Sequence, residues 1–267
     1  MRRVRLRWGV AAAVLVAAAA TISVASSASG TVRPSVVTST PCTSASYTLT
    51  VDVSAGGSSW SGSAAGQVDF VHDDLTANVT LPSNLPVPGL AGATVQLVLV
   101  GGTAYVGVPP ALAGFVGGAS WVSIALPTGI NRGIDALLTK GAQWCANAQS
   151  LVRTLGRGGV VSSLRTTTGS TPSSGVEVRL PGKKVLPALH VPRSLTHKSS
   201  GTVFGTSGVP VDVWSSGQGH LEGLAINSPS ASIDLELSNT NQPVDITAPV
   251  GAVPLSPSLL GLLGGLL

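Results

Sequence analysis

Charged and aromatic side chains are scarce in this sequence. Of its 267 residues, 10% are Asp, Glu, Lys or Arg and 4% are Phe, Trp or Tyr. Four of the fifteen basic residues are arginines between Met1 and Arg7, so eleven basic residues stand against eleven acidic ones in the rest of the chain. That part is formally neutral and has no row of basic side chains to neutralise phosphates. We therefore expect no nucleic-acid partner.

Catalytic and metal-binding motifs are also missing. The four histidines share no metal-ligand spacing, and the sequence has no H-E-x-x-H, nucleophile elbow or Gly-rich phosphate loop. The run His72-Asp73-Asp74 has the composition of a metal or acid-base cluster, but we interpret it as a charged hairpin turn. The sequence predicts a non-catalytic protein without metal or cofactor.

The N-terminus has the pattern of a secretory signal. Four arginines precede the apolar run 8–20, and small residues surround Ser26 and Ala28. We predict a signal peptide over 1–28 and export to the cell envelope or the extracellular space. The alternative is an uncleaved anchor, because the apolar segment that starts at Trp8 is just long enough to span a bilayer.

Two cysteines remain after the signal, Cys42 and Cys145. Exported proteins meet an oxidising environment, so we expect a disulfide between them rather than two free thiols. Lipidation of Cys42 is the third possibility. Pro41 occupies a position where a lipobox needs a small residue, and the apolar core is too distant, so we expect no lipoprotein anchor.

Gly, Ser, Thr and Val are abundant, which favours strands and turns over helix bundles. After a Ser/Thr/Pro-rich leader over 29–44, the segments 47–53 and 76–81 alternate between apolar and polar residues, as half-buried strands do. In 95–100 the alternation breaks down, because Leu97 and Leu99 face one way and Val98 and Val100 the other, which predicts a strand covered on both faces. Further strands are expected at 60–66, 67–72, 104–108, 121–126, 160–166, 175–180, 201–206, 209–214, 219–227, 230–238 and 243–246.

Two amphipathic helices are expected in the middle of the chain, over 129–139 and 143–155. Their apolar residues recur at helical spacing, and glycines follow the second one. Both are suited to cover one face of a curved sheet. The segment 181–198 has three prolines and no periodicity, so we expect a long loop there.

Short motifs in a fixed order between Ser44 and Pro249 resemble the LppX/LprG-type proteins of actinobacteria, which are related to the LolA and LolB lipoprotein carriers. The motifs are SYxLxV, G-x-VDF, GGTAYVGVP, WVSIALP, GVPVDVW, GQGHLEGL, SIDLELS and QPVDITAP. The resemblance assigns one domain to 45–249. The chain departs from the family in lacking a lipobox cysteine and an evident helix before the first strand.

The resemblance implies a mainly β fold: one strongly curved antiparallel sheet of about eleven strands, an incomplete β-barrel whose concave face is covered by helices. It also implies a hydrophobic cavity for the acyl chains of a lipid or an acylated glycolipid. From the residues alone, a filled core is an equal alternative, which would make the chain a structural or adhesive envelope module. The candidate cavity residues are Leu97, Leu99, Tyr105, Trp121, Ile134, Leu137, Trp144 and Leu151.

The tail over 250–267 ends in the uncharged run LSPSLLGLLGGLL. As a helix, its last nine residues would be about 14 Å long, too short to cross a bilayer. Contact with a membrane surface, docking over the cavity and simple disorder remain the alternatives.

Overall fold

One mixed sheet of twelve strands organises this protein. The computed structural model describes residues 41–55, 58–85, 89–163, 174–189, 204–205 and 208–255. In spatial order the strands are β12 (Val253–Pro254), β6 (Trp121–Ala125), β5 (Thr103–Gly107), β4 (Thr94–Val100), β3 (Asp74–Thr80), β2 (Ser58–Asp69), β1 (Ser44–Ala55), β11 (Ala231–Ser238), β10 (Leu221–Asn227), β9 (Gly208–Ser215), β8 (Ser174–Pro181) and β7 (Val160–Ser163).

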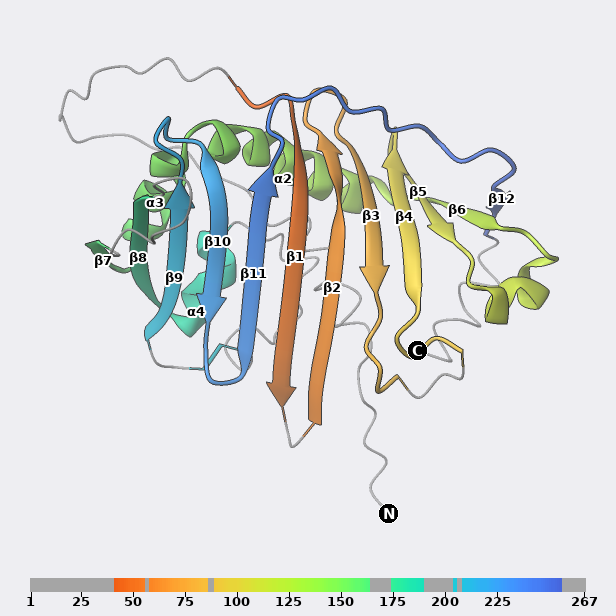
Figure 1. Ribbon diagram of the computed structural model, residues 1–267, viewed down its shortest axis with the longest axis horizontal. Helices are drawn as coiled ribbons and strands as arrows, with labels where there is room; N and C mark the ends of the chain where they lie inside the picture. Colours follow the sequence, from red (N-terminus) through yellow and green to blue (C-terminus); the bar gives the residue numbers. More distant parts are fainter. Residues whose placement is uncertain are drawn as a thin grey trace.

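All neighbouring strands pair antiparallel, except that β12 lies parallel to β6. The order begins at β12 and ends at β7, so the sheet is not closed into a barrel (Figure 1). This confirms the predicted class, a mainly β protein with an open, incomplete barrel and covering helices.

The helices lie behind the sheet in Figure 1. They are α2 (Thr128–Ala146), α3 (Ala148–Gly156) and α4 (Gly182–Ala188), and a 3-10 helix, η1 (Pro110–Val116), joins β5 to β6. Their main contacts with the sheet are made by α2 on β10 and by α3 and α4 on β8 and β9. The helices therefore cover mainly the strands β8, β9 and β10.

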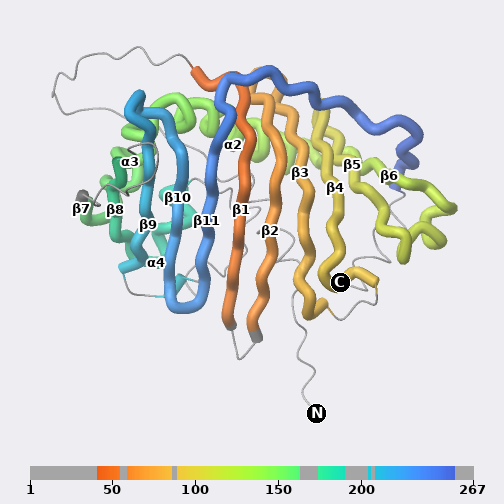
Figure 2. Tube along the Cα trace, viewed as in Figure 1, coloured from red at the N-terminus to blue at the C-terminus, as the bar shows by residue number. Residues whose placement is uncertain are grey.

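Strands from opposite ends of the described chain meet at the centre of the sheet. Tyr47 lies opposite Leu237, and the pairing continues to Val53 opposite Ala231. Figure 2 shows this neighbourhood as an orange segment beside a blue one. The alternation in β11 explains its orientation, because Ile233 is buried while Asp234 is exposed. The sequence pattern predicts this central part correctly.

Three strand predictions differ from the structure. The segments 60–66 and 67–72 form one strand, β2, because β1 pairs with it without interruption. Residues 243–246 form no strand. Instead, Val253 and Pro254, in the region predicted as the tail, pair with Val122 and Ser123.

The helices differ from prediction in two places. α2 continues to Ala146, and the break falls at Asn147, whose side chain accepts a hydrogen bond from the backbone N–H of Ser150 and caps α3. The expected loop over 181–198 begins with α4, where Pro181 precedes the first turn, a position that suits proline. The predicted signal, most of the leader, the strand 201–206 apart from residues 204–205, and the residues beyond 255 lie outside the described residues. Among the described helices, none has the length and apolar character needed to cross a membrane.

Candidate functional site

The two faces of the sheet differ sharply in polarity, and the strand register shows this directly. One row of paired residues crosses eight strands and is entirely apolar: Val95, Val79, Ala64, Leu49, Leu235, Leu224, Val213 and Val176. We call the surface formed by this row and the parallel rows two residues away the apolar face. The buried core residues of the strands lie on it, together with those of the helices.

The next row along the strands belongs to the opposite surface, which we call the polar face. Its members are Thr94, Thr80, Ser63, Thr50, Asp234, Ala225, Asp212, Glu177 and Ser162. Burial raises the pKa of Asp212 and Asp234, and the neighbouring carboxylates Glu177 and Glu236, respectively, raise them further. A shift of one residue in any strand would exchange the two surfaces, so this contrast fixes the register.

Burial along the apolar face is uneven. Under α3 and α4, Val178 and Val211 have an exposed fraction of 0%, and Leu224 on β10, which α2 contacts, has one of 2%. On the same face, but in strands β1 to β5, a group of residues is only half-buried: Val53, Trp60, Val79, Val95, Leu97 and Val106. We call this group the open part of the apolar face. Val79, Val95, Leu97 and Val106 are paired or adjacent in the register and form one continuous surface, and Val53 and Trp60 form a second pair.

A tyrosine and a glycine shape the centre of the apolar face. Tyr47 lies opposite Gly66, and its hydroxyl donates a hydrogen bond of 2.9 Å to the backbone oxygen of Thr76 on β3. A side chain at Gly66 would collide with the same backbone oxygen. Burial raises the pKa of Tyr47, so its hydroxyl stays protonated and available as a donor.

Six of the eight candidate cavity residues are apolar-face or helix residues. Leu97 and Leu99 lie on the apolar face of β4, and Ile134, Trp144 and Leu151 share the hydrophobic core with them, while Leu137 is buried elsewhere on α2. Trp144 and Leu151 have an exposed fraction of 0%, and the indole N–H of Trp144 has no hydrogen-bond partner among the described residues. Of these six residues, Leu97 is half-buried and the other five are buried.

The register separates the other two candidates from this group. The β4–β5 hairpin has only Gly101 and Gly102 in its turn, which places Tyr105 opposite Val98 on the polar face. Trp121 pairs with Gly107 and lies on that face as well. Val98 and Leu99 point to opposite faces and are both buried, so β4 is covered on both faces at these two residues, while Val95 and Leu97 are only half-buried.

Several residues of the open part were not among the candidates. Val79, Val95 and Val106 are small aliphatic residues of ordinary strands, and nothing in their local sequence distinguishes them from packed core residues. The two-residue turn at Gly101-Gly102 was the available signal, because a tight hairpin fixes which residues lie opposite one another. Applied to β4 and β5, it places Val106 beside Leu97.

The predicted disulfide is present. Cys42 and Cys145 are bonded, with their Cα atoms 5.8 Å apart and a sequence separation of 103. Cys42 lies two residues before β1, and Cys145 lies in the last turn of α2. The bond therefore attaches the end of the longest helix to the middle of the sheet.

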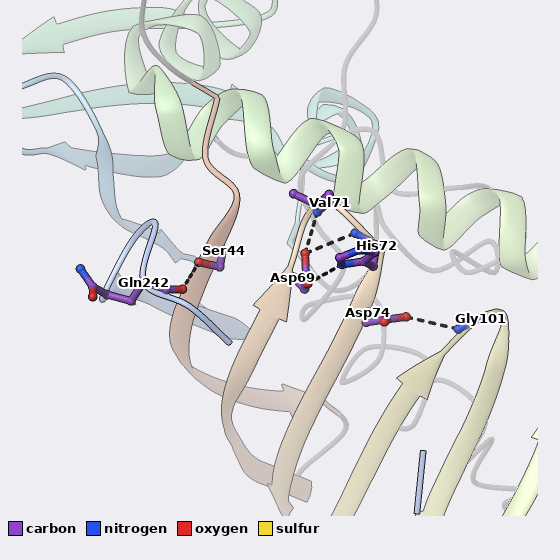
Figure 3. A network of polar contacts seen from close by, with 7 residues as sticks. All are labelled: Ser44, Asp69, Val71, His72, Asp74, Gly101 and Gln242. Carbon is purple, nitrogen blue, oxygen red and sulfur yellow. Dashed lines mark hydrogen bonds and ion pairs between the residues drawn. The ribbon is translucent and has the colours of Figure 1, made fainter. Parts of the chain in front are cut away.

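His72 and Asp73 lie in the β2–β3 turn, as expected, and Asp74 begins β3. Asp69 accepts hydrogen bonds from the backbone N–H groups of Val71 and His72, and its other oxygen lies 2.7 Å from Nδ1 of His72 (Figure 3). This hydrogen bond raises the pKa of His72. In the part of the chain that is described, no three His, Cys, Asp or Glu side chains are grouped to hold a metal ion.

Hydrogen bonds also join the chain segments at the end of the strands where the β2–β3 turn lies. Asp74 accepts a hydrogen bond from the backbone N–H of Gly101, and the Ser44 hydroxyl donates one to the backbone oxygen of Gln242 (Figure 3). Gly102 lies close to the side chain of Asn131 in the first turns of α2. The polar residues here fix turns against one another, and α2 passes beside them.

No protein-family model and no curated protein sequence matches the chain. Solved structures do. The lipoprotein LppX of Mycobacterium tuberculosis is 14% identical over 77% of this chain and 90% of its own, with a TM-score of 0.46. LprF of Mycobacterium bovis is 15% identical over 79% and 90%, with a TM-score of 0.42. A LolA superfamily protein of Nitrosomonas europaea is 10% identical over 76% and 87%, with a TM-score of 0.28. The chain is thus similar over most of its length to the solved structures of LppX and LprF, at 14% and 15% identity.

Proposed function

We propose that this chain is an exported, non-catalytic lipid-binding protein of the bacterial cell envelope. It holds the acyl chains of a lipid or an acylated glycolipid against the open part of the apolar face. The observation that carries this proposal is the uneven burial of that face, which is sealed around Val178 and Val211 and half-buried at the six positions of the open part, among them Leu97 and Val106.

An acyl chain suits this surface chemically. The open part consists of Val, Leu and Trp side chains, and its neighbours in the same rows, Ala64 and Ala77, are small. Each methylene moved from water to such a surface contributes about 0.8 kcal/mol. About ten buried methylenes would therefore contribute about 8 kcal/mol before the cost of ordering the lipid is subtracted.

Export agrees with the remaining chemistry of the chain. The disulfide between Cys42 and Cys145 is stable in the oxidising space outside the cytoplasm. The chain that follows the predicted signal has no net charge, so it does not attract anionic headgroups. We therefore expect apolar contacts with the acyl chains to dominate the affinity for lipid.

Two substitutions on one strand test the proposal. Leu97→Asp places a carboxylate on the open part of the apolar face, while Gln96→Asp places the same group on the exposed polar face one residue earlier. Titration with a fluorescent fatty acid should show binding weakened about tenfold or more by Leu97→Asp, because a buried charge is costly next to an acyl chain.

The matched control, Gln96→Asp, should change the dissociation constant less than about twofold. Thermal melting followed by circular dichroism verifies that both variants fold. Equal affinities for the two variants, or a wild-type protein that fails to bind the probe, would overturn the proposal.

A further inference from the structure

The connection between β5 and β6 exposes apolar side chains. Residues 108–120, which we call the apolar tip, include η1, and none of the seven η1 residues is buried. The phenyl ring of Phe115 has an exposed fraction of 74%. Leu112 and Val116 are half-buried beside it. Isolated exposed hydrophobic residues are common on protein surfaces, so the surroundings of Phe115 decide its significance.

The apolar tip has a fixed conformation. Its base is closed by a hydrogen bond of 2.9 Å from the backbone N–H of Val108 to the backbone oxygen of Ser120. Within it, the N–H of Gly118 donates to the oxygen of Ala113 over 2.8 Å, and Gly117 ends η1 with a φ of +66°. Because these backbone bonds hold the segment, Phe115 is presented to solvent by the fold.

The stretch of sequence that contains the tip is free of charge. No Asp, Glu, Lys, Arg or His occurs anywhere from Leu75 to Asn131, although these types are spread through the rest of the chain. The β3–β4 connection, which belongs to this stretch, reaches the tip, because Gly89 lies against the Ala111 side chain. Two uncharged connections therefore lie together at one end of the sheet.

The tip is also continuous with the open part of the apolar face. Val106 belongs to that part and lies two residues before the tip begins. The β4–β5 turn, next to the charged β2–β3 turn, lies at the opposite end of β5. The molecule thus has one polar end near His72 and one uncharged end near Phe115.

We infer that the apolar tip is a docking site for the surface of an uncharged lipid bilayer. Phe115 and Leu112 enter the interfacial region, and the absence of charge over the whole stretch removes the desolvation cost that would oppose such contact. A zwitterionic surface is the matching partner, since no basic residue is present to attract anionic headgroups. This inference goes beyond the proposed function, because it concerns attachment to a membrane and not the lipid held inside.

Sedimentation with phosphatidylcholine vesicles tests the inference on the full mature chain. Phe115→Ser should lower the partition coefficient about tenfold or more, because one aromatic side chain is withdrawn from the interface. Val160→Ser is the matched control, since Val160 on β7 has an exposed fraction of 72% and lies at the far edge of the sheet. This control should bind within about twofold of wild type.

Three further results decide the matter. Binding should be the same in low and high salt, and a chain shortened before Leu259 should keep its dependence on Phe115. Leu97→Asp should weaken binding of the fatty-acid probe but keep vesicle binding, which separates this site from the proposed cargo site. The inference is overturned by equal vesicle binding of wild type and Phe115→Ser, by a requirement for anionic lipid, or by a Phe115-dependent dimer in place of vesicle binding.

Discussion

Removal of the disulfide should weaken the protein substantially. The bond joins Cys42, just before the central strand β1, to Cys145 at the end of α2. Both cysteines are buried, with exposed fractions of 2% and 0%. Reduction, or the double substitution Cys42→Ala/Cys145→Ala, removes this covalent link between the start of β1 and the end of α2.

The expected magnitude follows from the length of the closed loop. A separation of 103 residues gives a loss of unfolded-state entropy worth about 5 kcal/mol at 25 °C in the chain-entropy model. Domains typically have a free energy of unfolding of about 5–15 kcal/mol, so the loss is a third of the stability or more. With a urea m-value of about 2–3 kcal/mol per molar, the midpoint should fall by about 2 M.

Urea titration with and without a reducing agent measures this shift. Wild type should lose stability on reduction, whereas the double alanine variant should be indifferent to the reductant and resemble reduced wild type. A midpoint that moves by less than about 0.5 M on complete reduction would refute the reasoning, because it would mean that the loop is already constrained in the unfolded chain.

Other predictions concern single polar contacts. Tyr47→Phe removes the hydrogen bond to the backbone oxygen of Thr76 and should lower the free energy of unfolding by about 1 kcal/mol, measured by urea titration; an unchanged midpoint would contradict this. Asn147→Ala removes the N-cap of α3 and should lower the free energy of unfolding by about 1 kcal/mol in the same assay, with a lower Tm as an independent readout. The His72 pKa should lie above its ordinary value and fall toward it in Asp69→Asn, as NMR titration of the imidazole would show; an identical pKa in both proteins would exclude the pairing.

Much of the sheet could be predicted from the sequence, because local alternation sets which face a residue takes. Leu49, Val51 and Ile233 alternate with polar residues, and the structure buries all three. The sequence pattern wrongly predicts two strands in place of β2, because the apolar-face residues Ala64 and Gly66 are small and give little hydrophobic signal. Its continuity depends on pairing with β1, which no local pattern contains.

Elements that depend on distant contacts were beyond the sequence pattern. β12 is two residues long and exists only because Val253 meets Val122 on a strand far away in sequence. α4 contains Pro187, a residue typical of loops, and is held by packing on β8 and β9. The open part of the apolar face was likewise hidden, since partial burial results from where the helices lie and not from the strands themselves.

The central claim is that the open part of the apolar face holds acyl chains, and lipid extraction tests it most directly. Protein purified from its native cells should release a lipid or an acylated glycolipid in roughly equimolar amount, identified by mass spectrometry, while Leu97→Asp purified in parallel should release about a tenth of it or less. Repeated lipid-free preparations of wild type, combined with a failure to bind a fluorescent fatty acid, would contradict the claim.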